Sequence, residues 1–184
     1  MSEPAFDPNG AVRFDLKSGT ASDGRGARLV LVPASALAAV EQQAPGALAA
    51  LASAVGEGCG ERVAARLGGE EGVRAATLEL VVAHLAGELA IAGLGAIQLE
   101  RWGRAMVLVV DGPAVESDAF VSSVLSGALA AATGRNVAIA ALGSDGSRAR
   151  YFVGAERTVD RVRAQVTEGA PWADVLRALQ EGAA

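Results

Sequence analysis

The stretch IQLERWGRAMVLVVDGPAV (residues 97–115) is followed along the chain by DAFVSSVLSGALAAATG (118–134) and RNVAIAALGSDGSRARYFVG (135–154). The first and third stretches hold short runs rich in Val and Ile that end at the turn signals Gly112-Pro113 and Ser144-Asp145-Gly146, which is typical of strands. The second holds a broad apolar face and ends at Gly134, which is typical of a helix. These patterns predict strands at 96–101, 104–110, 136–142 and 148–153, with a helix at 118–133.

The composition sets limits on the class of protein. A chain of 184 residues fits one domain, and 51% apolar against 20% charged residues is enough to build a core. The formal net charge is −5, and the arginines form no continuous basic stripe. Because nucleic-acid binding needs clustered cations, we expect none here.

Cysteine use and hydropathy predict a location. One cysteine excludes an internal disulfide and favours a reducing compartment. The start, MSEPAFDPNG, is acidic with two prolines and does not resemble a signal peptide. The longest uncharged run, 119–134, is shorter than the roughly 18 to 20 residues of a membrane span. We therefore expect a soluble cytoplasmic protein.

The N-terminal part is expected to begin with a flexible segment, residues 1–10, ahead of one globular domain, 11–184. Alternation of Val12, Phe14 and Leu16 with charged residues predicts a half-buried strand. A loop at 18–26 and a second strand at 28–32 follow. Ser35 is the predicted N-cap of a helix that extends to residue 43.

Two longer helices come next. The first, 45–67, carries Gly56, Gly58 and Gly60 inside its apolar line, and each glycine costs about 1 kcal/mol relative to alanine. Another element crossing closely, a break in the helix, or room for a ligand would each explain them. The second helix, 73–92, is apolar on two sides and is expected to lie between other elements. Helices at 155–168 and 171–181 complete the chain.

Catalytic constellations are not evident in the sequence. A zinc or iron site needs several converging ligands, but the chain has one His and one Cys, on different predicted helices. His84 stands four residues before Glu88, a spacing that predicts a local ion pair. Cys59 is expected to act as a small core hydrophobe with an inert thiol. We expect a protein that is not an enzyme and that holds no metal or cofactor.

The order of three motifs resembles a known superfamily, which contains the small TRAPP tethering subunits and the bacterial 4-vinyl-reductase-type ligand-binding domains. The motifs are GEGCGERVAARLG with LELVVAHLAGELA, then ERWGRAMVLVVDGP, then VLSGALAAATG, and the likeness covers residues 46–154. It implies an α+β, TRAPP-like domain with an antiparallel sheet of about four strands packed on helices. The N-terminal strands and two C-terminal helices add to that core.

The resemblance also implies a role in adaptor complexes or in sensing small apolar ligands, often as a dimer. Some TRAPP subunits carry an acylated cysteine near the position of Gly69 to Gly72, where this chain has none. The C-terminal cysteines that 4-vinyl-reductase-type domains often have are missing too. Acylation and metal or redox use are therefore not carried over.

The first functional hypothesis is a non-enzymatic bacterial adaptor or scaffold that forms a homodimer and binds a protein partner. For the last helix, the alternative to docking a partner is that its apolar face packs on its own domain. The residues expected to make the interactions are apolar and lie on the helices 118–133 and 171–181: Phe120, Val124, Leu125, Trp172, Val175, Leu176 and Leu179.

The second hypothesis is a sensor that binds a small apolar ligand between the glycine-rich helix and the central strands. Such pockets are mostly apolar with few polar anchors. Arg101, Arg104 or His84 would supply the anchor. The remaining residues expected in this pocket are Gly56, Cys59, Gly60 and Trp102.

Overall fold

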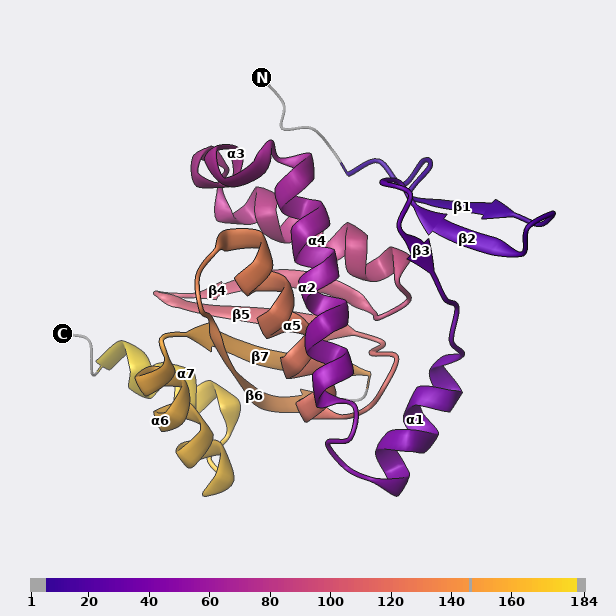
Figure 1. Cartoon of the computed structure of the whole chain (residues 1–184). Coiled ribbons are helices and arrows are strands. Elements are labelled where there is room, and N and C mark those ends of the chain that lie inside the picture. Colours follow the sequence, from indigo (N-terminus) through magenta and orange to yellow (C-terminus); the bar gives the residue numbers. More distant parts are fainter. Residues whose placement is uncertain (1–5, 146, 182–184) are drawn as a thin grey trace.

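The chain folds as an α+β protein (Figure 1) with seven helices and two antiparallel sheets within residues 6–145 and 147–181, which the computed structural model describes. The predicted fold class, a four-stranded antiparallel sheet packed on helices with N-terminal strands and two C-terminal helices, is confirmed. The elements are β1 (Val12–Asp15), β2 (Thr20–Asp23), β3 (Arg28–Leu29), α1 (Ala34–Gln43), α2 (Ala49–Arg66), α3 (Gly69–Ala75), α4 (Leu78–Ile91), β4 (Ala96–Trp102), β5 (Ala105–Asp111), α5 (Asp118–Thr133), β6 (Ala138–Asp145), β7 (Arg148–Gly154), α6 (Glu156–Thr167) and α7 (Trp172–Glu181).

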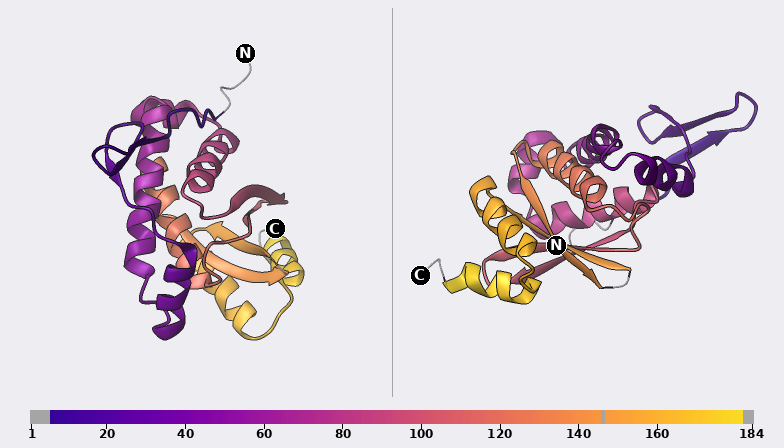
Figure 2. Two further views of the ribbon diagram at one scale, coloured as in Figure 1. Left: turned by 90° about the vertical axis from the view of Figure 1, so that its right-hand side faces the viewer. Right: turned by 90° about the horizontal axis from the view of Figure 1, so that it is seen from below.

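The N-terminal arm, residues 6–32, projects from the rest of the molecule (Figures 1 and 2). Its three strands pair in the order β1-β2-β3, and β2 lies where the sequence predicted a loop. The strand around Val12 exists, but Phe14 is 60% and Leu16 91% exposed, so the predicted half-buried face is wrong. The reason is that this small sheet has no helical layer over that face.

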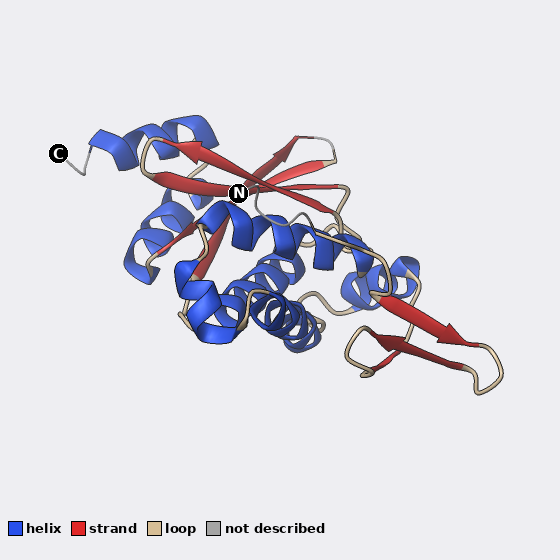
Figure 3. Cartoon of the chain, turned by 90° about the horizontal axis from the view of Figure 1, so that it is seen from above, coloured by secondary structure: helices blue, strands red, loops and turns tan. Residues whose placement is uncertain are grey.

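The central sheet has the strand order β4-β5-β7-β6, all antiparallel. In β5, Leu108 pairs with Leu99 of β4 on one side and Tyr151 of β7 on the other. Because successive side chains alternate across a strand, Leu108 faces one helical layer and Val107 the other. Helices cover both faces of the sheet (Figure 3), which explains the unbroken apolar run of β5.

The inner layer consists of α2, α4 and α5. α4 packs on β4, α5 packs on β6, and α2 packs along α5. Together with one face of the sheet these helices form the larger core cluster. Its most deeply buried large side chains are Val63, Leu89, Val110 and Tyr151.

Glycines allow α2 and α5 to approach closely. A Cβ added to Gly56 would lie 2.1 Å from the Val124 carbonyl oxygen, and one added to Gly60 would lie 2.2 Å from that of Ala128. From the other side, a Cβ on Gly127 would lie 2.5 Å from the Ser53 oxygen. Real Cβ contacts essentially never fall below 3.0 Å. For Gly56 and Gly60 the structure shows the crossing element, whereas Gly58 faces only the Arg62 side chain, and the helix is continuous through all three.

The outer layer consists of α6 and α7 on the opposite face of the sheet. α6 packs on β6 and β7, and α7 packs on β5 and α6. The smaller core cluster lies beneath them and includes Val107, Val109, Leu142, Phe152, Val159, Val162, Val175 and Leu176.

Several predicted boundaries need correction. The helix predicted at 73–92 is two helices, α3 and α4, because Thr77 adopts an extended conformation and its side chain caps α4 by accepting the Leu80 N–H. The strand predicted at 28–32 ends at Leu29. At the start of α1 the N-cap is Pro33 rather than Ser35. Residues 1–5 lie outside the described residues, and so does Gly146 in the predicted hairpin turn. The division into a flexible segment 1–10 and a globular domain 11–184 stays a prediction.

Candidate functional site

A groove of about 630 Å³ lies at one end of the outer layer, where α7 leaves part of the sheet uncovered. Four separate segments build it: the β4–β5 turn with the start of β5, the end of β7, the start of α6 and the end of α7. Its lining residues are Gly103, Arg104, Ala105, Met106, Phe152, Val153, Gly154, Ala155, Thr158, Arg161, Leu179 and Gln180.

The groove has an apolar floor and a polar rim. Ala105, Phe152 and Leu179 contribute hydrophobic surface, and all three pack in the smaller core cluster beneath the groove. Arg104 and Arg161 are both exposed, and no ion pair engages either one within the described part of the chain. Their guanidinium groups are therefore free to bind an acceptor on a ligand.

The β4–β5 turn is held against α7 beside this groove. Gly103 has φ 60°, a conformation that favours glycine, and a Cβ there would lie 2.9 Å from the Gln180 amide nitrogen. Next to it, the Trp102 ring meets Trp172 edge-on at 5.1 Å between ring centroids. The Arg150 guanidinium lies 4.7 Å from the centroid of the Trp172 ring. This aromatic cluster fixes one end of the groove.

The residues of the predicted ligand pocket lie on both sides of the sheet. Gly56 and Gly60 face the α5 backbone, which fills the space beside them. Cys59 is fully buried between the inner helices, where it accepts a hydrogen bond from Arg62 Nη2 at 3.2 Å, and burial raises the pKa of its thiol. Trp102, by contrast, belongs to the outer aromatic cluster. The structure does not bring these residues together.

His84 is 6% exposed, and neither ring nitrogen has a hydrogen-bond partner among the described residues. The predicted ion pair with Glu88 is therefore wrong. Both oxygens of Glu88 are already engaged, Oε2 by Arg62 at 2.6 Å and Oε1 by Arg66 at 3.0 Å. Burial, with the nearby Arg66 charge, lowers the pKa of His84.

The interior between the inner layer and the sheet holds two small hollows of about 10 Å³ each. Both are lined by apolar side chains alone, and they share Leu89, Ile97 and Leu125. A volume of this size suits at most a single water molecule. An organic ligand would fit there only after these side chains moved.

The residues predicted to make protein interactions are mostly in the core. Phe120, Val124 and Leu125 are 3–4% exposed in the larger cluster, and Val175 and Leu176 are 1% exposed in the smaller one. Trp172 and Leu179 are partly buried against that same cluster. The face of α7 thus packs on its own sheet, the alternative that the sequence left open.

Within the described ranges, no group of three or more His, Cys, Asp or Glu side chains is placed to hold a metal ion. No helix in that part of the chain has the length and apolar character to span a membrane.

The fold is similar to that of a known sensory domain. No family model matches the chain, and no curated protein matches it. Among solved structures, the chain resembles the phenol-responsive sensory domain of the transcription activator PoxR, crystallised with phenol, with a TM-score of 0.59 and 15% sequence identity. The match covers 85% of this chain and 90% of that one. At this identity the likeness shows a shared fold, and membership of the TRAPP and 4-vinyl-reductase-type superfamily stays a prediction.

Sequence reasoning identified only part of the groove. It named Arg104 as a polar anchor, Trp102 beside the β4–β5 turn, and Leu179 as an interaction residue. It missed Phe152, Thr158 and Arg161, because they come from segments whose local patterns show only a strand and an amphipathic helix. No motif links segments that meet only when α6 and α7 fold onto the sheet.

Proposed function

We propose that this chain is a non-enzymatic sensory domain that binds a small molecule in the groove at the end of the outer layer. The observation that carries the proposal is the groove itself, whose 630 Å³ falls within the roughly 300 to 1,000 Å³ typical of ligand pockets. The shared fold with a phenol-responsive sensory domain supports the same function.

The lining defines the class of ligand. An apolar floor of Ala105, Phe152 and Leu179 suits an aromatic or aliphatic body. Arg104 and Arg161 at the rim suit a single carboxylate or oxygen acceptor on that body. A small aromatic acid such as benzoate combines both features, whereas phenol offers the body with a weaker acceptor.

An adaptor function has less support. Five of the seven residues expected to dock a partner are at most 4% exposed in this chain's own core, so a partner would reach them only if the core opened. Homodimer formation, a protein partner and a cytoplasmic location stay predictions.

Isothermal titration calorimetry with benzoate and with phenol tests the proposal. We expect saturable binding of benzoate, weakened about tenfold by Arg161→Gln because a charged hydrogen bond is lost. Leu179→Glu should abolish benzoate binding, because the introduced carboxylate would repel the carboxylate of the ligand. Arg157→Gln is the matched control, since Arg157 lies on the same helix but outside the groove lining.

Two results would overturn this assignment. Absence of saturable binding for both probes would remove the groove as a site for aromatic ligands. Undiminished binding to folded Leu179→Glu would place the ligand elsewhere in the molecule.

A further inference from the structure

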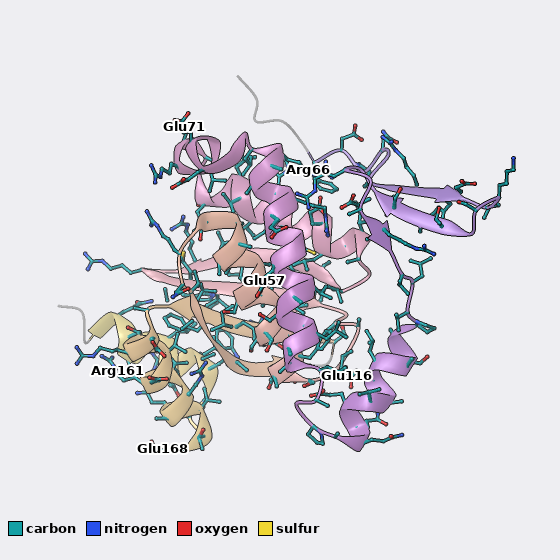
Figure 4. The ribbon with its side chains drawn as sticks, in the orientation of Figure 1. Glu57, Arg66, Glu71, Glu116, Arg161 and Glu168 are labelled. Atoms are coloured by element: carbon teal, nitrogen blue, oxygen red, sulfur yellow. The ribbon has the colours of Figure 1, made fainter. Side chains whose placement is uncertain are left out.

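A cleft of about 370 Å³, called the arm cleft below, lies between the N-terminal arm and the C-terminal half of α2. Figure 4 shows Arg66 at that end of α2, beside the base of the arm. Four arginines line this arm cleft, two from each side. The complete lining is Asn9, Gly10, Ala11, Arg13, Gly24, Arg25, Arg62, Ala65 and Arg66.

A buried carboxylate fixes the two arginines of α2. Glu88 of α4 is 2% exposed, and its oxygens accept from Arg62 Nε at 2.6 Å and from Arg66 Nε at 3.0 Å. Glu88 carries one negative charge against the two guanidinium groups, and the charge of the buried Asp23 acts on Arg62 as well. Each guanidinium has five N–H donors, and Glu88 uses only some of them.

The arm adds two further cations. Arg13 has no carboxylate partner within the described residues, while Arg25 lies 4.0 Å from Asp23 and 3.8 Å from Glu61, beyond hydrogen-bond distance in both cases. Asp23 itself accepts the backbone N–H groups of Arg25 and Ala27. Around the arm cleft, four arginines thus face three carboxylates, those of Asp23, Glu61 and Glu88. The chain as a whole has a net charge of −5.

An aromatic side chain keeps one wall of the arm cleft in place. Phe6 packs on α4, where a Cβ added to Gly87 would lie 2.3 Å from its ring, and it meets His84 edge-on at 6.0 Å between centroids. Arg66 lies over the same ring at 4.9 Å. Since this contact and the Glu88 pair both hold Arg66, its guanidinium is preorganised, which lowers the entropy cost of binding.

We propose that the arm cleft binds a small oxyanion, a phosphate or a carboxylate, through Arg13, Arg25, Arg62 and Arg66. Planar guanidinium groups match both anions with paired N–H donors. The bound anion would balance the one positive charge by which these four arginines exceed the carboxylates around them. Because the arginines come from the arm and from α2, it would also fasten the arm to the inner layer. This inference is independent of the groove.

Nuclear magnetic resonance titration of the full chain with inorganic phosphate and, separately, succinate tests the proposal at constant ionic strength maintained with chloride. We expect saturable shifts of arm and α2 amides with at least one anion. Arg13→Gln combined with Arg25→Gln should weaken binding at least about tenfold. These two residues are not paired with Glu88, so the inner layer should stay folded. The anion that binds more tightly identifies phosphate or carboxylate as the natural chemistry.

The matched control is Lys17→Gln combined with Arg28→Gln, which removes the same charge from the arm outside the cleft lining. It should leave binding unchanged. Equal weakening by this control pair would show general charge attraction and overturn the site, as would linear shifts that never saturate. Circular dichroism of each variant checks its fold. The titration of the wild-type chain tests for saturable anion binding independently of any variant.

Discussion

The two faces of the central sheet are covered by helices in different ways. On the inner face, α2 and α5 approach so closely that Gly56, Gly60 and Gly127 have no room for a Cβ, and the hollows there measure about 10 Å³. On the outer face, α6 and α7 cover only part of the sheet and leave a groove of about 630 Å³. Small residues produce a closed layer, whereas short amphipathic helices leave an open groove at their ends.

The largest effect expected from this difference is on inner-layer packing. Gly56→Ala with Gly60→Ala should lower the free energy of unfolding by about 4 kcal/mol, because each methyl group would overlap a carbonyl oxygen of α5. The matched control, Gly58→Ala on the same helix, would place its Cβ 3.6 Å from Arg62 Nη1. It should leave stability unchanged or raise it by up to about 1 kcal/mol. Urea denaturation measures both, and equal stabilities of the two variants would contradict the close contact.

A smaller effect separates the buried part of the outer layer from its rim. Leu176→Ala should cost about 3 kcal/mol of stability, since Leu176 is 1% exposed between α7 and the sheet. Leu179→Ala, three residues along the same helix, should cost less than about 1 kcal/mol because this side chain lines the open groove. Thermal unfolding of the two variants compares them directly. A cost at Leu179 as large as that at Leu176 would mean that the groove is closed in solution.

The smallest effect concerns the pH dependence of the inner layer. Burial and the Arg66 charge hold the pKa of His84 below 6.5, while Glu88 opposes them. The unfolded chain therefore takes up a proton near pH 6.5 that the folded chain does not, and stability should fall as pH drops from 7 towards 5. One residue contributes at most about 1.4 kcal/mol per pH unit. Because His84 is the only histidine, His84→Gln should lack this component in urea denaturation. An unchanged slope would show that His84 is solvated.

Much of the architecture could be predicted from local pattern. The helix predicted at 118–133 is α5 with the same bounds, and the four predicted strands of the central sheet are present with ends shifted by a few residues. Gly134 ends α5 with φ 67°, as its position predicted. These features depend on residues that are close along the chain, so local sequence pattern is enough to predict them.

Partners across long sequence separations were harder to predict. The spacing of His84 and Glu88 indicated a local pair, yet Arg62 and Arg66, more than twenty residues away, engage Glu88 instead. A buried carboxylate is stabilised more by two guanidinium groups than by one imidazole that burial keeps neutral. The choice depends on how α2 packs against α4, which no local spacing contains.

The sequence by itself determined the order of elements and the apolar faces of residues 97–154, because periodicity and turn residues act over a few positions. The tertiary structure alone decided where the groove and the arm cleft lie. The groove joins residues from 103 to 180, and the arm cleft joins Arg13 and Arg25 to Arg62 and Arg66. Both hollows exist only where separate elements meet, and their positions are set by packing over the whole chain.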